Sequence, residues 1–84
     1  MNWRISVTSP AEKQLSKIHW QDAQKIRSAI DRMADNPFVG DIQKMTGNAA
    51  WRRRVGSYRI FYIVNPVSRS IYIYEITRRT SKTY

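Results

Sequence analysis

The sequence predicts an α+β fold in which an antiparallel sheet carries a helical hairpin on one of its faces. Apolar residues recur at helical spacing between positions 9 and 35, whereas they alternate with polar residues from position 51 onwards. A third observation, an alternating segment at residues 3–8, adds a strand before the helices. The predicted order of elements is therefore β-α-α-β-β-β, and 84 residues suffice for one domain, residues 1–84.

The first strand and the first helix are predicted from residues 3–18. In residues 3–8 every second side chain is apolar, which is the pattern of a half-buried strand. Ser9 is then predicted as the N-cap of a helix, with Pro10 at the first helical position and Glu12 completing a capping box. The buried stripe of this helix is expected to consist of Ala11, Leu15 and Ile18.

A second helix is predicted over residues 22–35. Its link to the first, through His19 and Trp20, is so short that the two helices are expected to run antiparallel. Asn36 should end the second helix, because a residue that precedes proline is disfavoured in helical conformation. The apolar positions that define its buried stripe are Ala23, Ile26, Ile30 and Met33.

The remainder of the chain predicts a loop and three strands. Residues 37–50 contain one proline and two glycines and are expected to form the loop. The strands are expected at residues 51–55, 58–64 and 70–76, joined by turns at 56–57 and from Asn65-Pro66 to about residue 69. The last eight residues are polar and basic.

Composition excludes several kinds of site. The chain has no cysteine, so disulfides, thiolate metal sites and cysteine nucleophiles are excluded, and one histidine, His19, cannot build a histidine metal cluster. No apolar run approaches the ~18 residues that a membrane helix needs, and the first residues lack the apolar stretch of a signal peptide. We therefore expect a cytoplasmic protein with no metal, no cofactor and no membrane partner.

The distribution of charge predicts a polyanionic partner. The chain carries a net charge of +9, of which residues 51–84 hold +7. Guanidinium groups are suited to bidentate phosphate contacts and to stacking on bases. The basic residues of this half are Arg52, Arg53, Arg54, Arg59, Arg69, Arg78, Arg79 and Lys82, opposed by Glu75 alone.

Strand alternation predicts where these arginines point. In residues 58–64 one parity is wholly apolar or aromatic and should face the helices, which sends Arg59 to the open face of the sheet. By the same argument Arg52 and Arg54 point to the open face, joined by Arg78 or Arg79 from the end of the last strand. Arg53 shares parity with core residues, a conflict that exposure at a sheet edge or snorkelling would relieve.

Two plainer interpretations stay open for this face. Residues 52–54 could be a solvated strand edge whose charge deters sheet-to-sheet pairing, although this does not explain Arg59 on a central strand. The aromatic and aliphatic residues of the face are expected mainly to pack against one another across strands. They are Phe61, Ile63, Tyr72 and Tyr74.

Residues 51–62, read as W-R-x-R-V-G-x-Y-R-I-x-Y, carry a family resemblance. Followed by a turn, an aliphatic strand and a basic tail, this motif resembles the RelE/ParE superfamily of bacterial toxins from type II toxin–antitoxin modules. The resemblance covers nearly the whole chain. It implies a RelE/ParE-like, microbial ribonuclease-like fold and a cognate antitoxin protein as partner.

The superfamily resemblance implies one of two activities. RelE-like members cut mRNA in the ribosomal A site, whereas ParE-like members poison DNA gyrase. The RelE-like branch is favoured, which implies a metal-independent endoribonuclease acting by 2′-OH attack, with mRNA on the ribosome as substrate and contacts to 16S rRNA. The alternatives are a gyrase inhibitor without nuclease activity and a protein that binds RNA or the ribosome without cleaving.

The same resemblance implies roles for individual residues. Arg59 matches the phosphate-binding arginine of the family, and Tyr84 matches its C-terminal tyrosine. Either Arg78 or Arg79 matches the C-terminal arginine, and these four residues form the expected catalytic set. Because arginine stays protonated, the general base is expected to be Tyr84 or Lys82, unless catalysis is mainly electrostatic. The expected RNA-binding residues are Arg52, Arg54 and Lys82.

Overall fold

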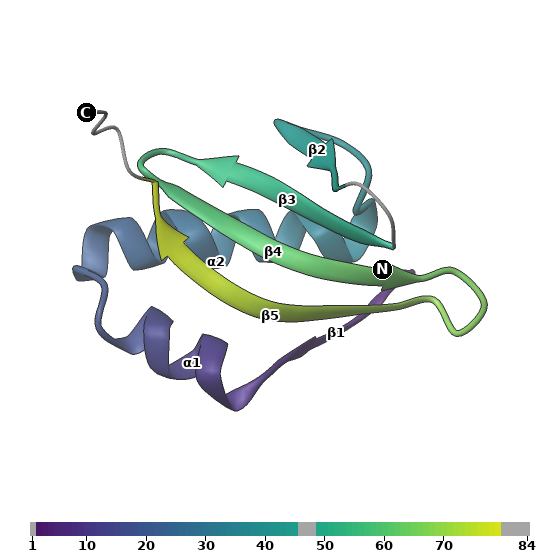
Figure 1. The fold of residues 1–84 in the computed structure, drawn as a ribbon, viewed down its shortest axis with the longest axis horizontal. Helices are drawn as coiled ribbons and strands as arrows, with labels where there is room; N and C mark the ends of the chain where they lie inside the picture. The colour runs from purple at the N-terminus through teal and green to yellow at the C-terminus, as the bar shows by residue number, and fades with distance from the viewer. Residues whose placement is uncertain (1, 46–48, 80–84) are drawn as a thin grey trace.

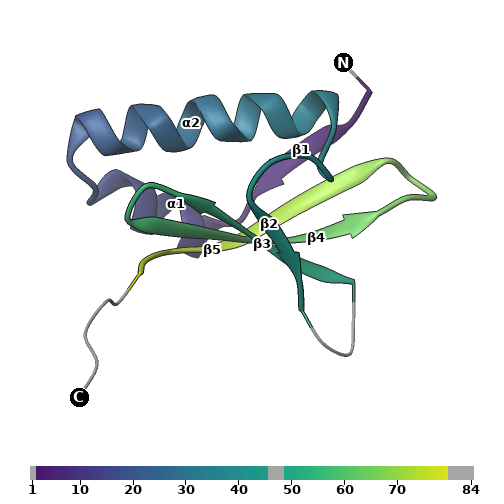
Figure 2. The ribbon, with the colours of Figure 1, turned by 90° about the horizontal axis from the view of Figure 1, so that it is seen from above.

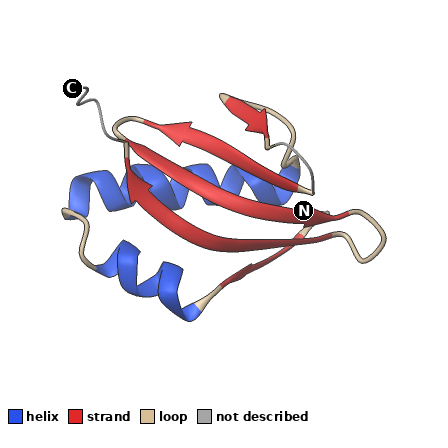
Figure 3. Ribbon diagram, viewed as in Figure 1, coloured by secondary structure: helices blue, strands red, loops and turns tan. Residues whose placement is uncertain are grey.

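The computed structural model of the protein describes residues 2–45 and 49–79. In these ranges the chain forms two helices and five strands, coloured separately in Figure 3. Along the chain they are β1 (Arg4–Val7), α1 (Ser9–Ser16), α2 (Trp20–Asp35), β2 (Ile42–Lys44), β3 (Ala50–Val55), β4 (Tyr58–Asn65) and β5 (Ser70–Arg78).

The strands form one sheet in the order β1-β5-β4-β3-β2 (Figure 1). Strands β2 to β5 pair antiparallel with their neighbours, and the three strands predicted after residue 50 are confirmed. The predicted α+β class is confirmed, but two details of the prediction, an antiparallel sheet throughout and a loop over residues 37–50, are wrong. β1 joins the sheet parallel to β5, which makes the sheet mixed. The segment predicted to be all loop contains β2, whose three residues pair with β3 but are too few to show an alternating pattern.

The helices lie on one side of the sheet and leave the other side open (Figure 2). α2 runs across the sheet, while α1 packs beside β5, where the Gln14 side-chain oxygen accepts a hydrogen bond from the Ile76 amide at 2.8 Å. The core lies between these layers and includes every apolar residue predicted for α2 except Ile30, which is partly buried. Its members are Ala11, Leu15, Ala23, Ile26, Ala29, Met33, Ile60, Tyr62, Val64, Ile71, Ile73 and Ile76.

The start of α1 differs from the prediction. Thr8, not Ser9, is the N-cap, because its extended backbone precedes the helix and its hydroxyl accepts a hydrogen bond from the Ala11 amide at 3.3 Å. Glu12 is therefore one position too late to complete a capping box. Pro10 is still tolerated, since the amides of a first helical turn have no partner within the helix.

The ends of α2 have clear local causes. The helix begins two residues earlier than predicted, because the His19 ring nitrogen Nδ1 accepts a hydrogen bond from the Gln21 amide at 3.3 Å and caps it. It ends as predicted at Asp35, where Asn36 takes up an extended conformation before Pro37. His19 thus has a structural role in the turn between the helices.

Tyr62 anchors the segment that follows α2 to the sheet. Its side chain is fully buried in β4 and its hydroxyl donates a hydrogen bond to the Pro37 carbonyl at 2.8 Å. Burial raises the pKa of Tyr62 from 10.0 to about 12, with a smaller opposing effect from the Arg53 charge. The phenol is therefore neutral at physiological pH and keeps the proton that it donates to the Pro37 carbonyl.

This buried phenol predicts a loss of stability in alkali. The folded chain keeps the Tyr62 proton to higher pH than the unfolded chain, so this contribution is complete below pH ~10 and is lost as the pH rises through about 12. Two pKa units correspond to about 2–3 kcal/mol. Urea unfolding at pH 8 and pH 11 should show a steeper loss for the native chain than for Tyr62→Phe. Equal losses would mean that Tyr62 does not limit alkaline stability.

Candidate nucleic-acid interface

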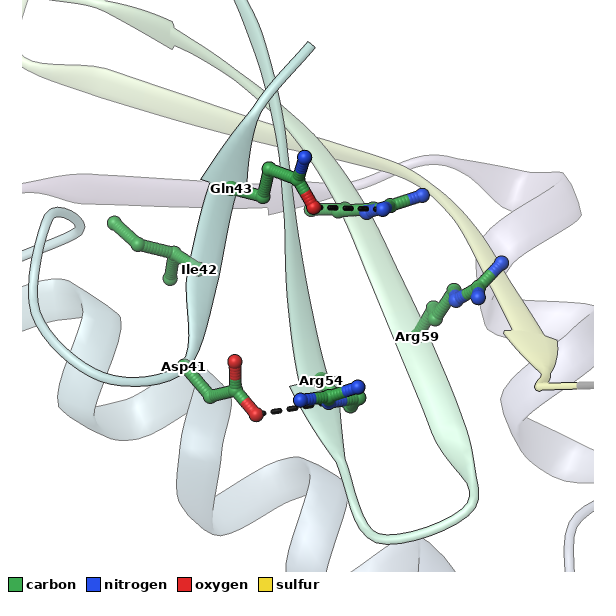
Figure 4. Close-up of a pocket in the computed structure, with 6 residues that line it drawn as sticks. Asp41, Ile42, Gln43, Arg54 and Arg59 are labelled. Atoms are coloured by element: carbon green, nitrogen blue, oxygen red, sulfur yellow. Dashed lines mark hydrogen bonds and ion pairs between the residues drawn. The ribbon is translucent and has the colours of Figure 1, made fainter.

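Three arginines from adjacent strands meet on the open face of the sheet, as the alternation predicted. Arg54 of β3 lies directly opposite Arg59 of β4, and Arg52 lies opposite Phe61. Together with residues 41–43 they line a groove of about 180 Å³ (Figure 4). Like charges opposite each other on neighbouring strands repel, so this arrangement favours binding of an anion.

β2 and the residue before it orient two of these arginines. The Arg54 Nε donates to the Asp41 carboxylate at 2.9 Å, and the Arg52 Nη2 donates to the Gln43 side-chain oxygen at 2.7 Å (Figure 4). The Arg54 and Asp41 side chains are half exposed, so the ion pair adds little stability and acts chiefly on orientation. Sequence reasoning missed Asp41 and Gln43, because nothing in the pattern of residues 37–50 indicated a strand beside β3.

Arg59 differs from its two neighbours in having no side-chain partner among the described residues. Within residues 2–45 and 49–79 no hydrogen bond or ion pair engages its guanidinium group. Its side chain projects from β4 at the groove margin (Figure 4). No group in the described part of the chain occupies its donors, whereas Arg52 and Arg54 each present a guanidinium already held in one orientation.

Arg53 is buried on the opposite side of the sheet. It pairs with the fully buried Ile60, and its own exposure is 9%. Edge exposure does not relieve the conflict seen in the sequence, because β2 covers β3. Instead the Arg53 Nη1 donates to the Val39 carbonyl at 2.7 Å, next to Gly40, whose φ is +106°. Arg53 therefore fastens the segment that carries Asp41, and so acts indirectly on Arg54.

Arg78 is the last residue of β5, whereas Arg79 lies just beyond the strand. Arg78 pairs with Tyr58 on the helix side, with its Cζ 6.0 Å from the Tyr58 ring centroid, and it is exposed. The Arg79 Nη1 donates to the Gly56 carbonyl at 3.0 Å. Gly56 lies in the turn that joins β3 to β4, close to the Arg54–Arg59 pair. Neither residue lines the groove. Of the two, Arg79 lies at the turn next to that pair.

The two remaining predicted site residues, Lys82 and Tyr84, lie outside the described residues. Within the described ranges no group of three or more His, Asp or Glu residues could hold a metal ion. Among those residues no helix is both long and apolar enough to cross a membrane.

A second basic groove, of about 400 Å³, lies between α2 and β3. No carboxylate is among its lining residues, and Arg54 lines this groove as well as the first. The basic surface therefore continues from the open face around β3 to α2. The cations that line the second groove are Lys25, Arg32, Arg53 and Arg54.

Residues 5–82 match the model of a protein family described as the ParE toxin of the type II toxin–antitoxin system parDE. The chain belongs to this toxin family. Since the match spans almost all of the toxin, the superfamily resemblance seen in the sequence is confirmed. A search of curated protein sequences found no significant match.

Solved structures of related fold cover the toxin almost completely. The archaeal RelE–RelB complex from Pyrococcus horikoshii OT3 superposes with a TM-score of 0.88 at 23% identity, covering 98% of the toxin and 100% of that chain. The isolated Escherichia coli RelE toxin gives 0.83 at 12% identity, covering 95% and 87%. The YoeB dimer from Staphylococcus aureus gives 0.73 at 17%, covering 95% and 100%. At these identities the similarity establishes the fold of the toxin.

Proposed function

We propose that the toxin is a ribosome-dependent endoribonuclease that cleaves mRNA in the A site and thereby arrests translation and growth. The observation that carries this proposal is the groove that gathers Arg52, Arg54 and Arg59, with Arg59 free of any described partner. A single-stranded RNA backbone is the anion whose repeated charges fit several guanidinium groups on neighbouring strands.

Cleavage by the 2′-OH of the RNA requires three things of the protein. A group must accept the hydroxyl proton, positive charge must stabilise the phosphorane, and an acid must protonate the leaving 5′-oxygen. Arg59 is assigned to the phosphorane, because free donors aimed at developing charge are the most effective stabilisers. Arg52 and Arg54, held by Gln43 and Asp41, are assigned to the flanking phosphates.

The other roles fall to the end of the chain. Arg79 is the better placed of the two tail arginines to add positive charge, because it is bound at the turn beside the Arg54–Arg59 pair. The proton acceptor is assigned to Tyr84 or Lys82, since guanidinium groups cannot lose a proton at neutral pH. This group takes the proton from the 2′-OH and then, as the acid, returns it to the leaving 5′-oxygen. The proposed reaction needs neither a metal nor a cofactor.

The proposed partners follow from the charge of the surface. The groove between α2 and β3 is assigned to ribosomal RNA, because it is lined by four cations and no carboxylate. A cognate antitoxin with an acidic or amphipathic segment would neutralise the same surface. The cytoplasm is the location that this proposal requires.

Inhibition of DNA gyrase is the second candidate function. It is favoured by the match to the ParE toxin family model, because ParE-like members of the superfamily act on gyrase. This candidate requires a protein-binding surface and no chemistry. A third candidate, binding of RNA or the ribosome without cleavage, shares the groove of the nuclease but requires no proton acceptor.

Primer extension on a reporter mRNA translated in vitro separates these candidates. The nuclease should produce cuts within A-site codons that disappear when ribosomes are omitted. Arg4→Ala, an exposed strand arginine at the far edge of the sheet, is the matched control and should cut normally. Intact mRNA with inhibited supercoiling would establish gyrase as the target. Intact mRNA with stalled ribosomes would establish binding without cleavage.

A further inference from the structure

The open face of β4 and β5 carries aromatic side chains beside the arginine groove. The Phe61 and Tyr74 ring centroids lie 6.2 Å apart, and Phe61 is the direct cross-strand neighbour of Arg52. Two residues after Phe61 on the same face of β4, Ile63 pairs with Tyr72, and these two residues are 41% and 42% exposed. The expected cross-strand packing is thus present, but it leaves much of this surface uncovered.

A β-bulge places one of these rings. Phe61 pairs with Glu75 and Tyr62 pairs with Ile73, so Tyr74 is an extra residue without a cross-strand partner. A bulge re-aims the side chain of the extra residue, and Tyr74 here reaches the Phe61 ring. The register change therefore brings a second aromatic ring against Phe61, the cross-strand neighbour of Arg52.

The charges on this face divide it into two zones. Arginines occupy β3 and the start of β4, while the one carboxylate on β5, Glu75, lies opposite Phe61. A phosphate is attracted to the first zone and repelled by the second, whereas a base can stack on rings and donate its amino hydrogens to a carboxylate. A single strand with its backbone over β3 would thus project its bases over β4 and β5.

We propose that Phe61, Tyr72 and Tyr74 form a base-stacking platform for single-stranded RNA, next to the phosphate-binding arginines. This inference rests on the proposed RNA substrate and specifies how the strand lies on the sheet. Its ligand is a run of unpaired bases, which every aromatic face accepts with little sequence preference. An apolar helix of a protein partner is the competing occupant, and the test below distinguishes the two.

The test compares two labelled oligonucleotides with the same number of phosphates, one bearing bases and one abasic. Both carry 2′-O-methyl groups, so that binding is measured by fluorescence anisotropy without cleavage and without ribosomes. The native toxin should bind the base-bearing strand at least about tenfold more tightly, since stacking on aromatic residues is strong and independent of charge. Arg59→Ala should weaken both strands equally and reduce the salt slope by about 0.7.

Variants at Tyr72 identify the interaction. Tyr72→Leu keeps an apolar side chain but has no π-face, and it should lose about fivefold or more on the base-bearing strand alone, whereas Tyr72→Phe should bind as the native chain does. Trp20→Ala removes an aromatic residue that is 65% exposed on α2, and it should change nothing. Equal binding of the two strands, or full binding by Tyr72→Leu, would overturn the platform and favour a protein occupant.

The two proposals fail separately in this design. A toxin that cuts mRNA on the ribosome yet binds abasic and base-bearing strands equally keeps the proposed nuclease and loses the platform. A toxin that prefers base-bearing strands but leaves translated mRNA intact keeps the platform and loses the nuclease.

Discussion

Arg59→Ala is expected to reduce mRNA cleavage by about 100- to 1000-fold while leaving the fold intact. This is the size of effect seen when one donor to a developing oxyanion is removed. No other described residue binds the Arg59 guanidinium, so its loss leaves no protein group unpaired. It also ends the repulsion from Arg54 directly opposite, so the melting temperature should stay constant or rise slightly.

The measurement is primer extension alongside thermal unfolding of the same preparations. Arg59→Lys keeps the charge but loses the planar, forked donors, and it should retain an intermediate activity. Arg4→Ala should match the native chain in both assays. An Arg59→Ala protein that melts normally and still cuts at the native rate would remove Arg59 from the mechanism.

Gly40→Ala is expected to destabilise the toxin by about 2–4 kcal/mol. Gly40 has a φ of +106°, a backbone conformation that residues other than glycine rarely adopt. In addition, an added Cβ would lie 2.8 Å from atoms of the Arg53 guanidinium. The guanidinium would have to move and give up its hydrogen bond to the Val39 carbonyl. Urea unfolding of the purified variant measures the loss.

A double-mutant cycle with Arg53→Met separates the two causes. Methionine keeps much of the aliphatic stem but removes the guanidinium, so Gly40→Ala should cost about 1 kcal/mol less in this background. The remaining cost belongs to the backbone. A cost that is the same in both backgrounds would show that the close approach to Arg53 contributes nothing.

Strand alternation was sufficient to predict the faces of β3 and β4. Successive side chains of a strand point to opposite sides, so the apolar parity that includes Tyr62 determined the direction of Arg59 without any knowledge of strand partners. The same rule placed Arg52 and Arg54 correctly. Local geometry of this kind depends only on neighbouring residues, and it also accounts for the correct end of α2 before Pro37.

Features that depend on distant parts of the chain could not be predicted in this way. Which strand lies beside β1 follows from packing of the whole sheet, and β2 exists only because β3 provides its partner. The position of Arg53 on the core side of β3 could not be explained from the local pattern. Its hydrogen-bond acceptor, the Val39 carbonyl, lies 14 positions earlier in the chain. The orienting roles of Asp41 and Gln43 depend on the same unpredicted strand.

The pairing of β1 with β5 has a consequence for when the protein can fold during its synthesis. The strand that is synthesised first finds its partner in the described strand that is synthesised last, and β5 also supplies three of the central core residues. Because such a long-range pairing cannot form early, the sheet that supports the arginines has no completed core until residues 70–78 have been added. On the ribosome that makes it, the toxin therefore cannot complete its folded sheet before β5 has been synthesised.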